Sequence, residues 1–190
     1  NDAYFDGYGE LERNDGTILK GVFKKGQLFD GLKIFSKNSY NVKSFEGIFN
    51  YNPDIIIKYN DCNKSSYKKG KLTWNDDDFY DGTFKSNINY NNLFDVGIYK
   101  SGNLIEGEHQ KIYEGSFFSF DHIKLKKGKK ILIEPVTKNI EIEDDIKLKE
   151  VYEDCTFNES SKVIDGTQIN IYSDKKWIYK WENSKKVNTK

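Results

Sequence analysis

The chain of 190 residues is only 36% hydrophobic, and aromatic side chains, at 15%, supply an unusually large share of that content. Few aliphatic residues, 15 Gly and only 2 Pro are typical of a thin or elongated β structure with shallow burial. The 30 basic and 30 acidic residues cancel and are interspersed, which argues against a nucleic acid partner attracted by a long-range field.

The first predicted element is a β-hairpin over residues 6–31, DGYGELERNDGTILKGVFKKGQLFDG. Phe5-Asp6-Gly7 and Phe29-Asp30-Gly31 bound it, and Asn14-Asp15-Gly16 lies between two strand-like runs. Because Asp-Gly accepts the positive φ angles of a tight hairpin, the turn is predicted there.

A triplet of aromatic residue or Ile, acid and Gly recurs along the chain. It occurs seven times, whereas the composition gives fewer than about one by chance. Several copies continue into Phe two residues after the glycine, as in Glu46-Gly47-Ile48-Phe49, and Cys155 stands in the glycine position of a near-copy. The remaining triplets end at Gly47, Gly82, Gly107, Gly115 and Gly166. This repetition predicts a series of hairpins with loops of variable length.

The hairpin over residues 4–31 resembles the MORN repeat, in which an aromatic-Glu-Gly-x-aromatic strand is followed by a glycine turn and a G-x-G strand. The residues that carry the resemblance are Gly7-Tyr8-Gly9-Glu10-Leu11, Asp15-Gly16, Gly21-Val22-Phe23-Lys24-Lys25-Gly26 and Asp30-Gly31. The resemblance is weaker over residues 78–118 and fades after residue 120. It implies an all-β, elongated antiparallel meander of repeated hairpins in a single-layer sheet, used as a scaffold and able to self-associate.

We therefore predict three segments. Residues 1–119 are MORN-like hairpin repeats with an insert at about 51–68, residues 120–183 are degenerate repeats or a cap, and residues 184–190 are a solvated tail. Within the cap, residues 176–181 alternate their rings on one face with Ile178 and Lys180 on the other.

The repeated rings are the candidate protein-binding residues. In a strand, rings at positions i and i+4 share a face, and a glycine between them leaves room for a ring from the neighbouring strand. In a single-layer sheet one such face has no second layer over it, so a partner segment, a second copy or residues 120–183 must cover it. In the last case the rings are core. The residues of this predicted stripe are Phe23, Phe49, Phe84, Phe117 and Trp74.

A second possible function is peripheral binding to anionic phospholipids, which the MORN resemblance also implies. Lysines near an anionic surface attract it by on the order of 1 kcal/mol each. The candidate lipid-binding residues are Lys124, Lys126, Lys127, Lys129 and Lys130.

Residues suited to catalysis or metal binding are sparse. His109 and His122 each stand beside one carboxylate without a nucleophile motif. The cluster Asn75-Asp76-Asp77-Asp78 suits an acidic hairpin turn better than a calcium loop. Cys62 and Cys155 are predicted to be ordinary thiols. The sequence therefore predicts a protein that is not an enzyme and that has no cofactor or metal, with a protein partner or a homodimer.

The sequence contains no apolar run long enough to span a membrane and no signal peptide. It also contains no Met, so Asn1 is not expected to be a translation start. The weakly constrained expectation is an intracellular protein, either cytoplasmic or peripherally associated with membrane or cytoskeleton.

Overall fold

The computed structural model describes residues 4–36, 42–54, 66–85, 93–101, 110–118, 123–135, 147–172 and 175–188. Every regular element in these ranges is a β-strand, and the strands pair antiparallel with their neighbours in the sequence. The predicted all-β meander of hairpins is confirmed. The chain divides into two compact units, Asn1–Asp95 and Val96–Lys190, and this division falls inside the predicted repeat segment 1–119.

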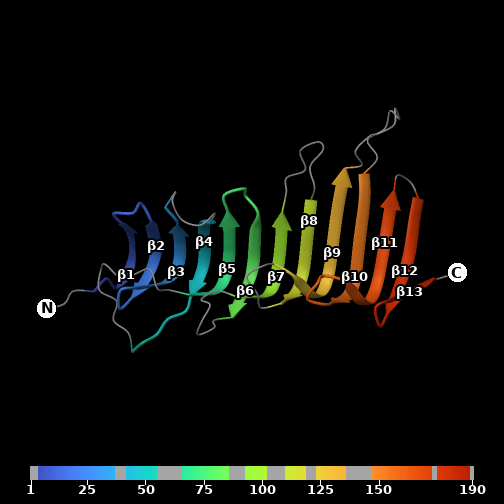
Figure 1. Cartoon of the computed structure of the whole chain (residues 1–190). Helices are drawn as coiled ribbons and strands as arrows, with labels where there is room; N and C mark the ends of the chain where they lie inside the picture. The colour runs from blue at the N-terminus through green and yellow to red at the C-terminus, as the bar shows by residue number, and fades with distance from the viewer. Residues whose placement is uncertain are drawn as a thin grey trace. The chain divides into compact units, whose positions relative to one another are not determined.

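The first unit is a meander of six strands followed by the start of a seventh (Figure 1). Its first hairpin has the predicted turn, since Gly16 has φ 81° and its amide donates to the Arg13 carbonyl. The strands are β1 (Gly7–Glu12), β2 (Ile18–Lys24), β3 (Gln27–Ile34), β4 (Val42–Phe49), β5 (Tyr67–Trp74), β6 (Phe79–Lys85) and the first residues of β7 (Leu93–Ser101).

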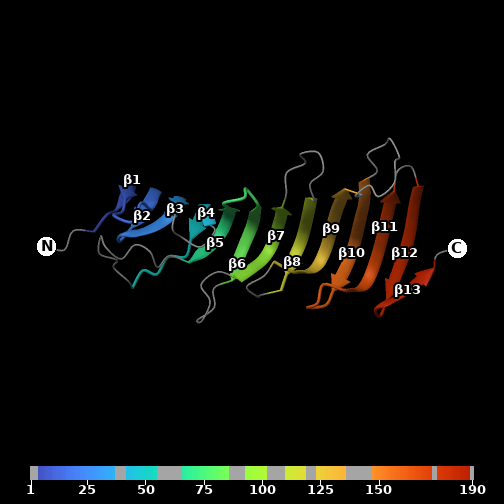
Figure 2. The ribbon, with the colours of Figure 1, turned by 45° about the horizontal axis from the view of Figure 1, so that its top comes forward.

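The second unit continues with the rest of β7 and has longer strands at its centre. Figure 2 shows β8 to β12 curving along their length. These strands are β8 (Gln110–Phe117), β9 (Leu125–Pro135), β10 (Lys147–Phe157), β11 (Val163–Tyr172), β12 (Lys175–Glu182) and β13 (Lys185–Asn188). The predicted tail is therefore shorter than expected, because Lys185–Asn188 pair with β12 after a two-residue turn at Asn183 and Ser184 with φ 48° and 63°.

A line of glycines crosses the strands of each unit in register. In the first unit it comprises Gly9, Gly21, Gly31, Gly47, Gly70 and Gly82. In the second unit it comprises Gly97, Gly115, Gly128, Cys155 and Gly166. We call this the glycine line, the face that carries it the inner face, and the opposite face the outer face.

Strands β4 and β6 bend where they cross the glycine line. Phe45 and Phe49 are four residues apart, about 13 Å in a flat strand, yet their ring centroids lie 4.9 Å apart. Tyr80 and Phe84, on either side of Gly82, lie 5.1 Å apart in the same way. The inner face is thus folded onto itself at the glycine line.

Facing glycines make this bend possible. A Cβ placed on Gly47 would lie 2.6 Å from the Gly70 Cα and would collide with the Lys69 carbonyl oxygen, and Gly47 itself has φ 146°. The sequence predicted that neighbouring rings would lie across these glycines, which is wrong for this pair. It holds only in part at Gly9, against which the ring of Phe5 lies, from the segment before β1 rather than from a neighbouring strand.

The bend creates a core without a second layer. Inner-face rings from both sides of the glycine line contact one another, and Phe45 and Tyr80 are 0% exposed. Burial is therefore deeper than the composition suggested. In the second unit the corresponding core is smaller and consists of Phe117, Leu125, Cys155, Phe157 and Val163.

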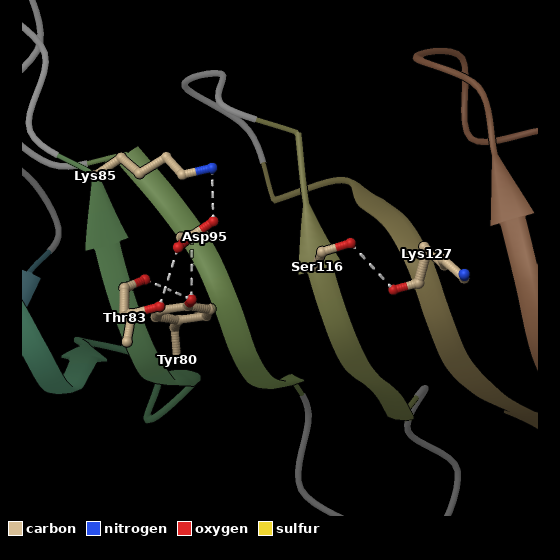
Figure 3. Close-up of polar contacts among 6 residues, drawn as sticks. All are labelled: Tyr80, Thr83, Lys85, Asp95, Ser116 and Lys127. Atoms are coloured by element: carbon tan, nitrogen blue, oxygen red, sulfur yellow. Dashed lines mark hydrogen bonds and ion pairs between the residues drawn. The ribbon is translucent and has the colours of Figure 1, made fainter.

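A polar network closes the end of β6 against β7 in the first unit (Figure 3). The Tyr80 hydroxyl donates to the Thr83 carbonyl at 2.9 Å and accepts from the Asp95 amide at 3.2 Å. Asp95 in turn accepts from the Thr83 hydroxyl at 3.3 Å and pairs with the Lys85 ammonium at 2.8 Å. In the second unit the Ser116 hydroxyl donates to the Lys127 carbonyl at 3.5 Å (Figure 3).

Candidate functional site

The predicted aromatic stripe lies in the core. Phe23 and Phe49 are each 1% exposed, Phe84 is 7% exposed and Phe117 is 4% exposed. Trp74 is half-buried, with its ring centroid 6.1 Å from that of Phe94. The burial of these rings supports the alternative that they are core, because the bend brings rings from both sides of the glycine line against one another.

The predicted lysine patch is divided between the two faces of β9. Lys127 and Lys129 lie on the outer face, opposite Ser116 and Glu114 of β8, and both are exposed. Lys126 is exposed and Lys124 is half-buried. Lipid binding through these four lysines stays a prediction, whereas the fifth lysine of the predicted patch differs from them.

That fifth member, Lys130, points to the inner face. Its ammonium lies 5.5 Å from the ring centroid of Tyr113, 5.3 Å from that of Tyr152 and 5.6 Å from that of Phe157. Burial lowers the pKa of Lys130, with Lys111 acting in the same direction and Glu150 opposing them. Three rings therefore shield this ammonium from an anionic surface.

The outer face of the second unit carries a feature that the sequence reading missed. Five β-branched side chains face each other in register across β8 to β12, and cross-strand pairs in register share a face. We call them the aliphatic row: Ile112, Ile131, Val151, Ile169 and Ile178.

The aliphatic row is least accessible at its centre and most accessible at its β12 end. Val151 at its centre is 8% exposed, Ile112, Ile131 and Ile169 are half-buried, and Ile178 is 45% exposed. Ile133 and Ile171 lie on the same face in the next register row, on either side of Lys149. In the first unit the corresponding register row, three residues from the glycine line, is interrupted by polar side chains and comprises Glu12, Ile18, Ile34, Ser44, Thr73 and Phe79.

Charges around the aliphatic row are unevenly distributed. Lys176 and Lys180 lie two residues to either side of Ile178 on the same face and are exposed. Val151 has Lys149 on one side and Glu153 on the other. The β12 end of the row is therefore basic on both flanks.

A sequence signal for the aliphatic row does exist. Ile131-Leu132-Ile133 and Ile169-Asn170-Ile171 alternate β-branched residues at a spacing of two, which puts the isoleucines on one face. The signal is local to each strand, however, and only the register of five strands shows that these side chains adjoin.

The described residues do not assemble a recognisable catalytic or metal-binding group. Within them no three His, Cys, Asp or Glu side chains are placed to hold a metal ion. The acidic cluster forms the β5–β6 turn as predicted, with the Trp74 amide donating to the Asp78 carbonyl at 2.9 Å and Asp77 at φ 64°. His109, His122 and Cys62 lie outside the described residues.

Cys155 occupies the glycine line and is fully buried. Its thiol lies 3.4 Å from the carbonyl oxygens of Glu153 and Thr167, and burial raises its pKa. A thiol in this setting is an inert packing group rather than a nucleophile.

Comparison with known proteins leaves the family open. No protein-family model matches the sequence, and the search of curated proteins gives no match. The resemblance to the MORN repeat therefore stays a prediction carried by the residues quoted above. Of the elements in the described ranges, none is a helix long and apolar enough to cross a membrane.

Proposed function

We propose that this chain is a non-catalytic protein-interaction module whose docking surface is the aliphatic row on the outer face of the second unit. The observation that supports it is the row itself, five β-branched side chains in register on a face of a single sheet. Contiguous apolar surface of this kind is characteristic of interaction sites, whereas scattered apolar residues are ordinary.

The proposal moves the binding surface away from the rings. Phe49 and Phe84 hold the core of the first unit, so their replacement is expected to unfold that unit rather than to remove a partner selectively. Outer-face side chains can be changed with far less effect on folding, because Ile178 already exposes 45% of its surface.

The test compares capture by the unchanged chain and by Ile169→Thr/Ile178→Thr. Threonine keeps the β-branched shape and removes apolar surface, so the strands are expected to persist. Chemical cross-linking in native lysate, quantified by mass spectrometry, is expected to lose its specific partner in the double variant. The matched control is Val22→Thr, which changes a 37% exposed valine on the first unit and is expected to keep capture.

The result that would contradict the proposal is equal capture by both variants, with circular dichroism showing both folded. Loss of capture by Val22→Thr alone would move the docking surface to the first unit. Co-sedimentation with phosphatidylserine vesicles that disappears on Lys126→Glu/Lys127→Glu/Lys129→Glu would instead support the lipid-binding alternative.

A further inference from the structure

The spacing and charge of the aliphatic row indicate what kind of segment it binds, and this inference rests on the proposed function. We propose that the row binds an amphipathic α-helix of about 13 residues from a partner protein, with acidic residues gathered at the end that lies over β12. The argument uses three properties of the row, namely its repeat distance, its length and its flanking charges.

The repeat distance distinguishes a helix from a strand. Neighbouring strands in a sheet lie about 4.8 Å apart, so the side chains of the row repeat at that distance. Residues three and four apart on one helix face repeat at about 4.5–6 Å, whereas same-face residues of an extended strand repeat at about 6.7 Å. Over the five side chains a helix stays within about 2 Å of register, and a strand drifts by more than about 7 Å.

The length of the row sets the length of the helix. Five strands from β8 to β12 contribute one side chain each, giving four gaps and a row about 19 Å long. At 1.5 Å per residue, a helix of about 13 residues spans that distance. Its apolar stripe would place four side chains, one per turn, along the row.

The flanking charges set its direction and chemistry. Lys176 and Lys180 flank the row on both sides at β12, whereas Lys149 at β10 and Lys129 at β9 each flank it on one side only, and Lys129 lies opposite Glu114. The acids on this face are Glu114 at β8, Glu153 at β10 and Glu182 at the end of β12. Glu182 lies opposite Lys185 in the β12–β13 register. Acidic residues of the partner helix would meet complementary lysines at the β12 end of the row. Because acids are favoured in the first turn of a helix, the N-terminus of the partner helix is placed over β12.

The experiment measures binding of synthetic, fluorescein-labelled 14-residue peptides to the whole chain by fluorescence anisotropy. One peptide carries leucines at helical spacing with three glutamates in its first turn. A second has lysines in place of those glutamates, a third has the leucines at alternate positions, and a fourth has the glutamates moved to the last turn. The first peptide is expected to bind at least about tenfold more tightly than the others at about 0.05 M salt.

Variants of the chain locate the site. Lys176→Glu/Lys180→Glu is expected to weaken the first peptide about tenfold at about 0.05 M salt and much less at about 0.5 M, because exposed charges are screened. Ile178→Thr is expected to weaken it at both salt concentrations. The matched control, Lys68→Glu/Lys69→Glu, makes the same change of charge on exposed positions of β5 and is expected to leave binding unchanged.

Each other outcome overturns a defined part of the proposal. If the lysine peptide or the last-turn peptide binds as tightly as the first peptide, the argument from charge is wrong. If the alternate-leucine peptide binds more tightly than the first, the partner segment is a strand and not a helix. Both outcomes leave the docking surface itself in place. Concentration-dependent self-association that Ile178→Thr abolishes assigns the row to a second copy instead. If no peptide binds and capture in lysate is also insensitive to Ile169→Thr/Ile178→Thr, the proposed function fails together with the inference.

Discussion

In the first unit closely packed rings flank the glycine line, and polar side chains interrupt the outer-face row three residues from it. In the second unit the rings beside the glycine line are less buried, and the corresponding outer-face row is aliphatic in all five strands from β8 to β12. Phe45 is 0% exposed among Phe49, Tyr67 and Phe84. At corresponding positions of the second unit, Tyr113 is half-buried beside Lys130. The two units thus share a bend and differ in where their apolar surface lies.

The difference shows that the bend and the apolar core are separable. Facing glycines bend the strands through their backbone, and Gly115 and Gly128 approach each other as Gly47 and Gly70 do. In β10 of the second unit, Cys155 takes the place of a glycine opposite Gly128 of β9, and the preceding residue, Asp154, has φ 52°. A register irregularity in β10 accompanies this replacement, so a bulge provides there what a glycine pair provides elsewhere.

The largest expected effect comes from breaking the bend itself. Gly47→Val places a β-branched side chain at φ 146°, with its Cβ 2.6 Å from the Gly70 Cα and against the Lys69 carbonyl oxygen. We expect a loss of more than about 4 kcal/mol in the free energy of unfolding, measured by urea denaturation. Gly16→Asn is the control, because Gly16 has φ 81° with open space around its Cβ position and Asn tolerates that conformation.

Comparable stability of Gly47→Val and Gly16→Asn would mean that the strands can bend without the glycine pair. Gly115→Val tests whether the same holds in the second unit, since a Cβ there would lie 2.9 Å from the Gly128 Cα.

The second prediction compares the two inner faces by removing one ring from each. Phe45→Ala deletes a fully buried ring and is expected to cost about 3–4 kcal/mol. Tyr113→Ala deletes a half-buried ring whose centroid lies 5.7 Å from that of Tyr99, and is expected to cost about 1–2 kcal/mol. Amide hydrogen exchange, read separately for each unit, measures both values. Equal losses would show that the second unit depends on its inner face as much as the first does.

Local parts of the fold could be predicted because their signals are contained in a few residues. Asp15-Gly16 defines its turn through glycine geometry, and the cysteine in the glycine position of β10 follows from the repeated triplet. The bend could not be predicted in this way, since it depends on the register of Gly47 with Gly70, and Gly70 stands between two lysines without the triplet. Because the bend was not foreseen, the rings were expected to be covered by a partner segment, a second copy of the chain or residues 120–183.

The candidate site was less accessible to sequence reading for the same reason. Ile112 and Ile178 are 66 positions apart in the sequence. They belong to one row only because four successive strand pairings bring the side chains between them into register. Lys130 also carries no mark that distinguishes it from Lys129, because a single register position decides which of two consecutive lysines faces the rings.

The third prediction concerns the polar network that ends the first unit. Tyr80→Phe removes the hydroxyl that donates to the Thr83 carbonyl and accepts from the Asp95 amide, and is expected to cost about 1–2 kcal/mol at pH 7. Burial raises the pKa of Tyr80 to about 12. The unfolded phenol ionises first, so this hydroxyl contributes stability below pH 10 that is lost as the pH rises from 10 to about 12.

Urea denaturation from pH 7 to pH 11 checks that assignment. The cost of Tyr80→Phe is expected to shrink above pH 10, since only the unchanged chain loses this contribution. A cost independent of pH would show that the hydroxyl is solvated when the chain is folded.

The smallest effect is expected from the buried lysine of the first unit, and its sign is stabilising. Lys33 is 7% exposed between Leu19 and Phe45 on the inner face, with its ammonium 4.7 Å from the ring centroid of Phe35. Burial lowers its pKa, Arg13 lowers it further and Asp15 opposes them, so the folded chain binds this proton less tightly than the unfolded chain. Stability therefore rises as the pH passes from the lowered pKa toward the ordinary value of 10.5.

Lys33→Met fills a similar volume without a charge and is expected to stabilise the first unit by about 1 kcal/mol at pH 7, because the cost of burying the ammonium exceeds the attraction of Asp15. The gain is expected to narrow as the pH rises through the lowered pKa of Lys33, because the folded chain then no longer buries a charge. Lys130→Met is the matched variant of the second unit, where three rings surround the ammonium and a smaller gain is expected. Tyrosine ionisation at high pH affects variant and unchanged chain alike, so the difference between them isolates the lysine. A loss of stability on Lys33→Met at pH 7 would mean that the ammonium contact with Phe35 outweighs the cost of burying the charge, and that the cations on the inner faces of both units are part of what holds them folded.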